Sequence, residues 1–387
     1  MRSVNFLSDN QVQLLHCGVD FFPALVSAIE GAQEEIYFET YIFANDDTGQ
    51  RVMKALIAAA RRGVQVRMIT DWFGTGNAQV SRLHAEMLAQ GIEHRIFNPW
   101  FRRGVTRTHR KICVVDRALA FVGGININDD MFSDRDHAIA LDAPRWDFAV
   151  QVQGPLVEQI HTEAHAQWAR LGKLGILKRM VLYRDLRKAT RAAARCVAQA
   201  AFVVRDNLRN RRTIQRAYLQ ALGRARKSVL LANPYFAPGR KFRRALAAAA
   251  ERGVEVVLLI GVGEFYLQDA VAHSFYPKLL ASGVRVVEYH KTQLHAKVAV
   301  IDDDWATVGS SNVDGLSLFL NQEANVVVKD AAFARSLRGH IEQAIGEGVE
   351  IHYEDFEHVS WLRRIGYEFA FICYKLLMHI FVVGKYA

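Results

Sequence analysis

Cysteine is scarce in this chain, and the few cysteines stand far apart. The 387 residues contain four, Cys17, Cys113, Cys196 and Cys373, and no two of them form a C-x-x-C pair. Disulfide frameworks and structural zinc sites depend on cysteines at closer and more regular spacing. The sequence therefore predicts neither, and it favours a reducing cytoplasm.

Long uninterrupted apolar runs are missing from both ends. Residues 1–9 contain no such run and no small-residue cleavage site, so we expect no secretory signal. Residues 361–387 are mostly apolar, but charged residues recur through them, whereas a transmembrane helix needs about 20 predominantly apolar residues. A spanning helix is therefore not predicted at either end.

The tail has its polar residues on one side. On a helix they fall within one sector of roughly 60°. They are Arg364, Glu368, Lys375 and His379. We therefore predict that residues 357–387 form an amphipathic helix that lies in a membrane interface. The alternative is a helix packed on the preceding domain with a narrow wet edge.

Positive charge is concentrated in one segment. The whole chain carries a net charge of +9, but residues 173–212 hold twelve Lys and Arg against only Asp185 and Asp206. Leucines alternate with basic residues in the part from 173 to 197, which is typical of a basic helix. This segment is either a solvated linker between domains or a surface that binds an anionic membrane, and the sequence leaves both open.

One motif occurs twice and organises the chain. His109, Lys111 and Asp116 have the spacing H-x-K-x-x-x-x-D, and His295, Lys297 and Asp302 repeat it. In each copy a glycine follows fourteen residues after the histidine and an asparagine seventeen after it, namely Gly123, Asn126, Gly309 and Asn312. Two copies with matched trailing residues indicate a duplicated site built by two halves of the chain.

Strand geometry explains the spacing of the motif. Side chains alternate along a strand, so a histidine and a lysine two positions apart point the same way. The apolar, mostly β-branched residues that follow favour a buried strand. The aspartate lies at an odd offset, where the sequence indicates a turn. Although Asp116 and Asp302 belong to the motif, we expect them to bind backbone amides and fix the strand end.

These residues resemble the phospholipase D superfamily, whose members use two such motifs from two homologous halves. Residues 39–43, 307–312 and 321–325 are similar to stretches of bacterial cardiolipin synthases, and the resemblance covers about residues 9–365. It implies a catalytic set of His109, Lys111, Asp116, His295, Lys297 and Asp302. It also implies a set that supports them or binds phosphate, consisting of Asn126, Asn312, Ser310, Asp147 and Glu323.

The two halves differ around their carboxylates. The resemblance implies that Asp147 and Glu323 each orient a catalytic histidine through its other ring nitrogen. Gly124 stands where the second half has Ser310, and about ten extra residues separate the first motif from Asp147. The halves therefore need not play the same role.

Strands and helices alternate in the same order in both halves. The first half is predicted to have a strand at 36–43, a helix at 48–62 ending at a glycine, and a strand at 64–69. The second half repeats this order, with a strand at 229–236, a helix that ends at residue 252 before a glycine, and a strand at 254–260. We predict an α/β fold of two homologous phospholipase D-like domains, packed with pseudo-two-fold symmetry around one shared active site. The predicted boundaries are 1–172, 173–197, 198–356 and 357–387.

The resemblance implies a phosphatidyltransferase of the cardiolipin synthase type. A covalent phosphohistidine would pass the phosphatidyl group to phosphatidylglycerol, giving cardiolipin and glycerol, with phosphatidylethanolamine as a second candidate substrate. The lysines and asparagines would hold the phosphate oxygens, so neither metal nor cofactor is expected. Family analogy favours His109 as nucleophile, although the sequence barely separates it from His295.

The expected partners are phospholipids and an anionic membrane surface. The enzyme would lie at the periphery of the cell membrane, on its cytoplasmic side. We expect the aromatic residues at the strand ends to line an apolar entrance, namely Tyr41, Phe43, Tyr235 and Phe236. A phospholipase D-type hydrolase or a nuclease would share every motif residue, but the apolar tail argues against a nucleic-acid partner. The sequence does not fix the oligomeric state.

Overall fold

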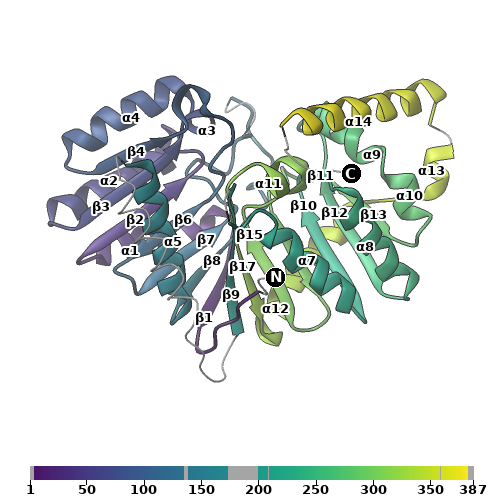
Figure 1. The fold of residues 1–387 in the computed structure, drawn as a ribbon, viewed down its shortest axis with the longest axis horizontal. Coiled ribbons are helices and arrows are strands. Elements are labelled where there is room, and N and C mark those ends of the chain that lie inside the picture. Colours follow the sequence, from purple (N-terminus) through teal and green to yellow (C-terminus); the bar gives the residue numbers. More distant parts are fainter. Residues whose placement is uncertain (1–3, 135–137, 173–198, 208, 358, 382–387) are drawn as a thin grey trace.

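Two β-sheets stand side by side at the centre of the molecule (Figure 1). The computed structural model describes residues 4–134, 138–172, 199–207, 209–357 and 359–381. The basic segment predicted at 173–197 lies outside the described residues, and the predicted domain boundaries remain a proposal.

The first sheet has seven strands in the order β1-β8-β7-β6-β2-β3-β4. Their bounds are β1 (Gln11–His16), β2 (Glu35–Thr40), β3 (Gln65–Asp71), β4 (Glu93–Phe97), β6 (Ile112–Val115), β7 (Leu119–Gly123) and β8 (Phe148–Gln153). Strands β2, β3 and β4 run parallel, and the other pairs are antiparallel. The sheet is therefore mixed, with the first motif strand β6 at its centre.

The second sheet repeats this order and adds one strand at its edge. Its order is β18-β13-β12-β10-β14-β15-β17-β9. The bounds are β9 (Gln199–Arg205), β10 (Ser228–Asn233), β12 (Glu255–Gly261), β13 (Arg285–Tyr289), β14 (Val298–Ile301), β15 (Trp305–Gly309), β17 (Glu323–Lys329) and β18 (Val349–Ile351). Strand β14 holds the place of β6, so the two motifs occupy equivalent strands. The predicted fold of two homologous α/β domains is confirmed.

Helices cover the outer faces of both sheets, and two more pack against both sheets at the centre (Figure 1). The outer layers are α1 (Cys17–Gly31) and α2 (Asp47–Arg61) on the first sheet, and α7 (Thr213–Arg224) and α8 (Arg240–Glu251) on the second. Helices α5 (Leu156–Leu171) and α12 (Ala331–Gly346) join residues of both sheets in one central core. This shared core holds the two halves together, as one site built from both requires.

Short elements connect β3 to β4, β4 to β6 and β12 to β13, and those that directly follow β3, β4 and β12 lie at the edge where these strands end. They are α3 (Trp72–Thr75), α4 (Asn77–Ala89), η1 (Pro99–Phe101), β5 (Arg102–Val105), α9 (Tyr266–His273) and α10 (Tyr276–Leu280). Three more elements complete the second half near this edge: β11 (Phe236–Ala237), β16 (Val313–Asp314) and α11 (Gly315–Phe319). Helix α13 (Tyr353–Glu357) leads to the tail.

The predicted elements differ from the observed ones mainly at their ends. The predicted strand 229–236 is interrupted, because Pro234 between β10 and β11 has no amide hydrogen to donate. The first helix begins at Cys17, and its N-cap residue His16 makes no side-chain capping bond that the sequence could have signalled. The stops at Gly63 and Gly253 are as predicted, since both have positive φ.

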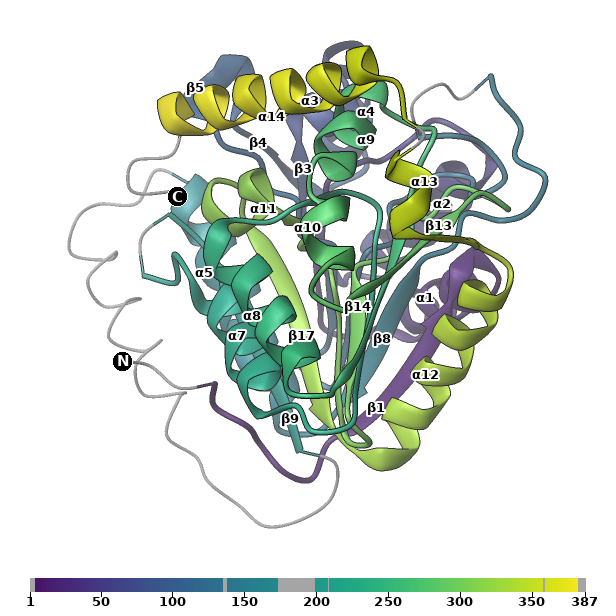
Figure 2. The ribbon, with the colours of Figure 1, turned by 90° about the vertical axis from the view of Figure 1, so that its right-hand side faces the viewer.

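The tail forms helix α14 (Trp361–Phe381), which lies across the edge of the second domain (Figure 2). One face packs on that domain: the Phe371 ring lies 5.0 Å from that of Phe275, and the Gly315 amide donates to Tyr374 Oη at 2.7 Å. The opposite face is apolar and exposed, including Phe369. The amphipathic helix predicted at 357–387 is therefore present from 361 to 381, residues 382–387 lie outside the described residues, and the helix also makes the contacts of the alternative. Within the described part of the chain, no helix is long and apolar enough to cross a membrane.

Candidate active site

The entry of each motif strand is paired with the other half of the chain. Thr108 forms a parallel bridge with Gln322, and Leu294 forms one with Trp146. The backbone amide of each motif histidine donates to the residue before the opposite carboxylate, His109 to Gln322 O and His295 to Trp146 O, both at 2.9 Å. These pairings bring the two motifs into one site at the interface of the sheets.

Each histidine is anchored through Nδ1 to a carboxylate from the other half. His109 Nδ1 lies 3.1 Å from Glu323 Oε2 and 3.0 Å from the carbonyl oxygen of Ser310. His295 Nδ1 lies 2.6 Å from Asp147 Oδ2. A carbonyl oxygen only accepts, so Nδ1 of His109 carries the hydrogen and Nε2 carries the lone pair.

Burial shapes the charge of both histidines. It lowers the pKa of His109, and the neighbouring Lys111 lowers it further, while Glu323 opposes the shift. Burial lowers the pKa of His295 well below its ordinary value, with Lys297 acting in the same direction. Both rings are therefore neutral near pH 7, which is the form in which Nε2 can attack.

Two buried lysines lie beside the histidines. Lys111 Nζ donates to His109 O at 3.0 Å, and Lys297 Nζ donates to His295 O. Burial and repulsion by Lys297 lower the pKa of Lys111 to about 7, and burial lowers that of Lys297. A phosphate bound between the lysines would favour their charged forms. Among the described residues, no group of three His, Cys, Asp or Glu side chains is arranged to hold a metal.

The two predicted asparagines have unsatisfied polar atoms. Asn126 and Asn312 are both buried, at 2% and 6% exposure. Within the described chain, Nδ2 and Oδ1 of Asn126 both lack a hydrogen-bond partner. Among the same residues, Oδ1 of Asn312 lacks one as well. Leaving such groups unpaired is costly, so the arrangement is suited to a ligand that supplies the missing partners.

Asp116 and Asp302 lie at the far ends of the motif strands from the histidines. Each accepts hydrogen bonds from three consecutive backbone amides. The donors are Gln33, Glu34 and Glu35 at 2.8, 2.8 and 2.9 Å, and Arg226, Lys227 and Ser228 at 3.1, 2.8 and 3.2 Å. The expected binding to backbone amides is confirmed, and the structure does not bring these two members of the set to the site.

Gly124 and Ser310 occupy equivalent positions, but Gly124 lies beside the short side chain of Asp147 and Ser310 beside the longer side chain of Glu323. A Cβ at position 124 would lie 2.3 Å from Asp147 Oδ1, so the Asp147 carboxylate needs the space that a side chain would fill. In the second half, Ser310 Oγ instead donates to Glu323 Oε2 at 2.5 Å. Burial raises the pKa of Asp147 to about 6, although Lys297 opposes the shift.

The extra residues of the first half carry a carboxylate that the sequence did not single out. Asp134 Oδ2 lies 3.5 Å from His295 Nε2. Its Oδ1 accepts from Asn128 Nδ2 at 2.7 Å and from Arg145, and its amide donates to Gln293 Oε1 at 3.1 Å. Burial alone would raise the pKa of Asp134, but Arg145, His295 and the Asn128 hydrogen bond together hold that pKa well below its ordinary value, so the carboxyl stays ionised. The ten additional residues were the only signal in the sequence.

The aromatic residues predicted to line an entrance divide into two groups. The Tyr41 ring lies edge-on to His109 at 4.8 Å, and Tyr235 donates to Glu264 at 2.8 Å. Phe43 and Phe236 are each only 1% exposed and belong to the cores. The prediction is wrong for these two, because each pairs through its backbone with a core residue, Ile127 or Val313, and turns its ring inward.

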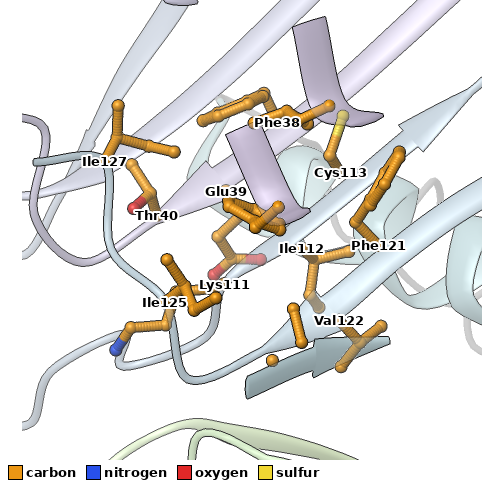
Figure 3. Close-up of a pocket in the computed structure, with 14 residues that line it drawn as sticks. Phe38, Glu39, Thr40, Lys111, Ile112, Cys113, Phe121, Val122, Ile125 and Ile127 are labelled. Atoms are coloured by element: carbon orange, nitrogen blue, oxygen red, sulfur yellow. The ribbon is translucent and has the colours of Figure 1, made fainter. Parts of the chain in front are cut away.

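A small cavity lies under the first motif (Figure 3). Glu39 and Lys111 line it together with apolar residues such as Phe38 and Ile112. Its volume of about 10 Å³ is room for roughly one water, so it is not a substrate site. Glu39 accepts a hydrogen bond from Thr108 Oγ1. This bond fixes the residue that precedes His109.

Known proteins resemble the chain in sequence and in fold. The family described as cardiolipin synthase, PLD-like domain, matches residues 25–160 and 218–345. Cardiolipin synthase B of Escherichia coli K12 is 39% identical over 339 residues, which cover 86% of this chain and 79% of that protein. Probable cardiolipin synthase YwiE of Bacillus subtilis is 29% identical over 356 residues, which cover 90% of this chain and 68% of that protein.

A solved structure shares the whole architecture. The phosphatidylserine synthase of Haemophilus influenzae aligns with 98% of each chain at a TM-score of 0.71 and 14% identity. At that identity the likeness concerns the fold alone, and it extends across both halves.

Proposed function

Because the chain belongs to the family of cardiolipin synthases with phospholipase D-like domains, we propose that it joins two phosphatidylglycerol molecules into cardiolipin and glycerol. It is a phosphatidyltransferase that acts on phospholipids. The observation that carries the proposal is the pair of histidines, each held at Nδ1 by a carboxylate of the other half. Phosphatidylethanolamine is a second candidate donor.

In the first step, His109 Nε2 attacks the phosphorus of the donor, and the bond from phosphorus to the glycerol oxygen breaks. His295 gives its Nε2 proton to that oxygen. Two carboxylates beside the His295 ring, Asp147 at 2.6 Å and Asp134 at 3.5 Å, support this assignment because they favour the imidazolium. A bound phosphodiester offsets Lys297, so the ring can take up its proton when substrate is present.

In the second step, the neutral His295 acts as the base. It takes the proton of an acceptor hydroxyl, the acceptor oxygen bonds to phosphorus, and the bond from phosphorus to His109 breaks. Lys111, Lys297 and the two asparagines hold the non-bridging oxygens and stabilise the charge that develops on them. These groups supply the charge and donors that a metal would otherwise provide, so the proposed reaction uses none.

The exposed face of α14 supports attachment to a membrane. Its apolar side chains are largely exposed, with Trp361 at 68%, Phe369 at 66% and Ile380 at 71%. An amphipathic helix of this kind binds in the boundary between headgroups and acyl chains. We propose that the enzyme is peripheral, on the cytoplasmic side of the cell membrane, with an anionic surface as its partner.

The test uses purified protein and phosphatidylglycerol vesicles, with products identified by mass spectrometry. We expect cardiolipin and glycerol in equal amounts. His109→Ala and His295→Ala should each lose at least about 10² to 10⁴ in turnover, as is typical when acid–base groups are removed. The exposed His352 lies outside the site, so His352→Ala is the control and should keep full activity. Near-normal turnover in either motif variant would contradict the shared site.

A donor with a good leaving group separates the two histidines. Departing p-nitrophenolate needs no proton, so phosphatidyl-p-nitrophenol requires only the nucleophile in the first step. We expect a stoichiometric burst of p-nitrophenolate from His295→Ala and none from His109→Ala. The reverse pattern would exchange the two roles.

The same assays cover the other activities of the superfamily. Phosphatidic acid as the main product at every lipid density would identify a hydrolase. Cleavage of plasmid DNA without any lipid product would identify a nuclease.

A further inference from the structure

The two histidines differ in what lies next to their reactive nitrogens. Twenty residues separate Asn126 from Asp147 in the first half, but only ten separate Asn312 from Glu323 in the second. The additional residues carry Asp134 across the interface to His295 Nε2, at 3.5 Å. The repeat therefore provides no equivalent position that would place a carboxylate at His109 in the same way.

Asp134 is held so that one of its oxygens faces the reaction. The bonds from Asn128 Nδ2 and Arg145 both go to Oδ1, which fixes the carboxyl plane. Oδ2 is the oxygen that points to His295. Only 10% of the side chain is exposed, and the Arg145 ion pair balances its charge. Oδ2 therefore presents a hydrogen-bond acceptor beside the reactive nitrogen of His295.

We propose that Asp134 is the residue that selects a vicinal diol as the acceptor, by accepting a hydrogen bond from the hydroxyl next to the reacting one. The reacting hydroxyl donates to His295 Nε2, and its neighbour donates to Asp134 Oδ2. The separation of these two acceptor atoms, 3.5 Å, is comparable to that of the two oxygens in a vicinal diol. The inference rests on the proposed function and adds its acceptor specificity.

The second step then uses both contacts. The reacting hydroxyl gives its proton to His295 Nε2, its oxygen bonds to phosphorus, and the bond between phosphorus and His109 breaks. The second hydroxyl stays intact and only orients the acceptor. A simple alcohol or a single water leaves Oδ2 without its donor, and sites built for a substrate hydroxyl reject analogues that lack it. Because the first step is the reverse of such an attack, the same contacts receive the departing glycerol of phosphatidylglycerol.

The test measures how one covalent intermediate is shared among competing acceptors. Phosphatidyl-p-nitrophenol forms the intermediate without using a diol, and equal concentrations of 1,2-propanediol and 1-propanol then compete for it. For the wild type we expect the propanediol product to exceed the propanol product at least about tenfold. A ratio below about two would overturn the proposal, whatever the variants do.

Asp134→Asn keeps the shape of the side chain but can turn an amide donor towards His295. We expect the ratio to fall towards one while the burst of p-nitrophenolate is unchanged. If Asp134 only supports the fold, all products fall together and the ratio stays as in the wild type. Asp130 lies in the same insertion but faces the Gly18 amide at 2.7 Å, so Asp130→Asn is the matched control. A wild type that makes no covalent intermediate would contradict the proposed function itself, which the burst reports separately.

Discussion

At the scale of single residues, the site is held in a narrow balance of charge. The two lysines repel each other, and three carboxylates compensate them only in part: Asp147, Glu323 and Asp134. Burial raises the pKa of Asp147 to about 6 and lowers that of Lys111 to about 7. Both groups therefore titrate close to neutrality, which is typical of groups that take part in chemistry.

We expect a narrow, bell-shaped dependence of kcat/KM on pH for a short-chain soluble diester. As pH falls through about 6, Asp147 becomes neutral and no longer supports the His295 imidazolium. As pH rises through about 7, Lys111 loses its proton and no longer attracts phosphate. The maximum should lie between these values, since kcat/KM reports the free enzyme.

Two variants test which residue causes the fall in kcat/KM on the acid side and which causes it on the alkaline side. Asp147→Asn should remove the acid limb, and Lys111→Met should remove the alkaline limb, each at reduced overall rate. A profile that stays flat up to pH 9 in the wild type would contradict the assignment of Lys111.

The site residues could be predicted where the sequence repeats and not where it departs from the repeat. The histidines, lysines and asparagines were identified because both copies carry them at equal spacing. The exchange of Asp147 and Glu323 between halves depends on how the sheets pack, which no local pattern encodes. Asp134 lies in a segment without a counterpart, so its approach to His295 could only be seen in the structure.

At the scale of elements, the motif aspartates connect each motif strand to the neighbouring strand. Asp116 accepts from the amides that lead into β2, and Asp302 from those that lead into β10. Asp116 and Asp302 both have positive φ, so the chain turns sharply there. The odd offset of the aspartate in the sequence was enough to predict this role.

Asp116→Ala and Asp302→Ala should therefore destabilise the fold without removing the chemistry. Losing bonds from an ionised acceptor to three amides should lower the free energy of unfolding by about 2–4 kcal/mol. We expect the folded fraction to keep turnover within about threefold of the wild type. Chemical denaturation and activity per folded molecule measure the two effects. A loss of turnover as large as that of His109→Ala would contradict this and indicate that Asp116 or Asp302 takes part in catalysis.

Helix α14 has one apolar face packed on the second domain and a second apolar face that is exposed. The sequence predicted an apolar helix with one charged edge, but not which face packs on the protein. The inward stripe, with Ala370 and Met378 buried, is as apolar as the exposed one, so hydrophobicity alone could not show which side faces the protein. The charged edge follows the boundary between them. The helix is thus fixed to the second domain while its outer face stays free for lipid.

Outer-face substitutions should reduce membrane binding and leave the fold intact. Phe369 and Leu376 are 66% and 59% exposed, and burying such a side chain in lipid contributes about 1.5–3 kcal/mol. Phe369→Glu and Leu376→Glu should each weaken sedimentation with anionic vesicles at least about tenfold. Val19 is 72% exposed on α1 in the first domain, so Val19→Glu is the matched control. Unchanged binding in the α14 variants, with unchanged melting temperature, would rule out this face.

At the scale of the whole molecule, the site and α14 share one edge. Strands β6 and β14 begin where β2 and β10 end, which puts both motif histidines on that edge. Helices α3 and α9 follow β3 and β12 on the same edge (Figure 1), and α14 packs on α9. The arrangement of two repeats around one site was predictable from the duplicated motif, whereas the position of the tail relative to the site was not.

This shared edge bears on whether the covalent intermediate goes to lipid or to water. Bulk water is far more concentrated than any lipid, so transfer requires an acceptor held at high effective concentration and a pocket kept dry. Docking through α14 would bring the site to a surface in which the acceptor lipid is concentrated. With vesicles we expect cardiolipin to exceed phosphatidic acid, and dilution of the lipid with excess detergent should shift the ratio towards phosphatidic acid. Phe369→Glu should show more hydrolysis at every detergent level, because it weakens docking without touching the site. A ratio that does not respond to detergent would mean that the pocket alone, through contacts such as that of Asp134, excludes water.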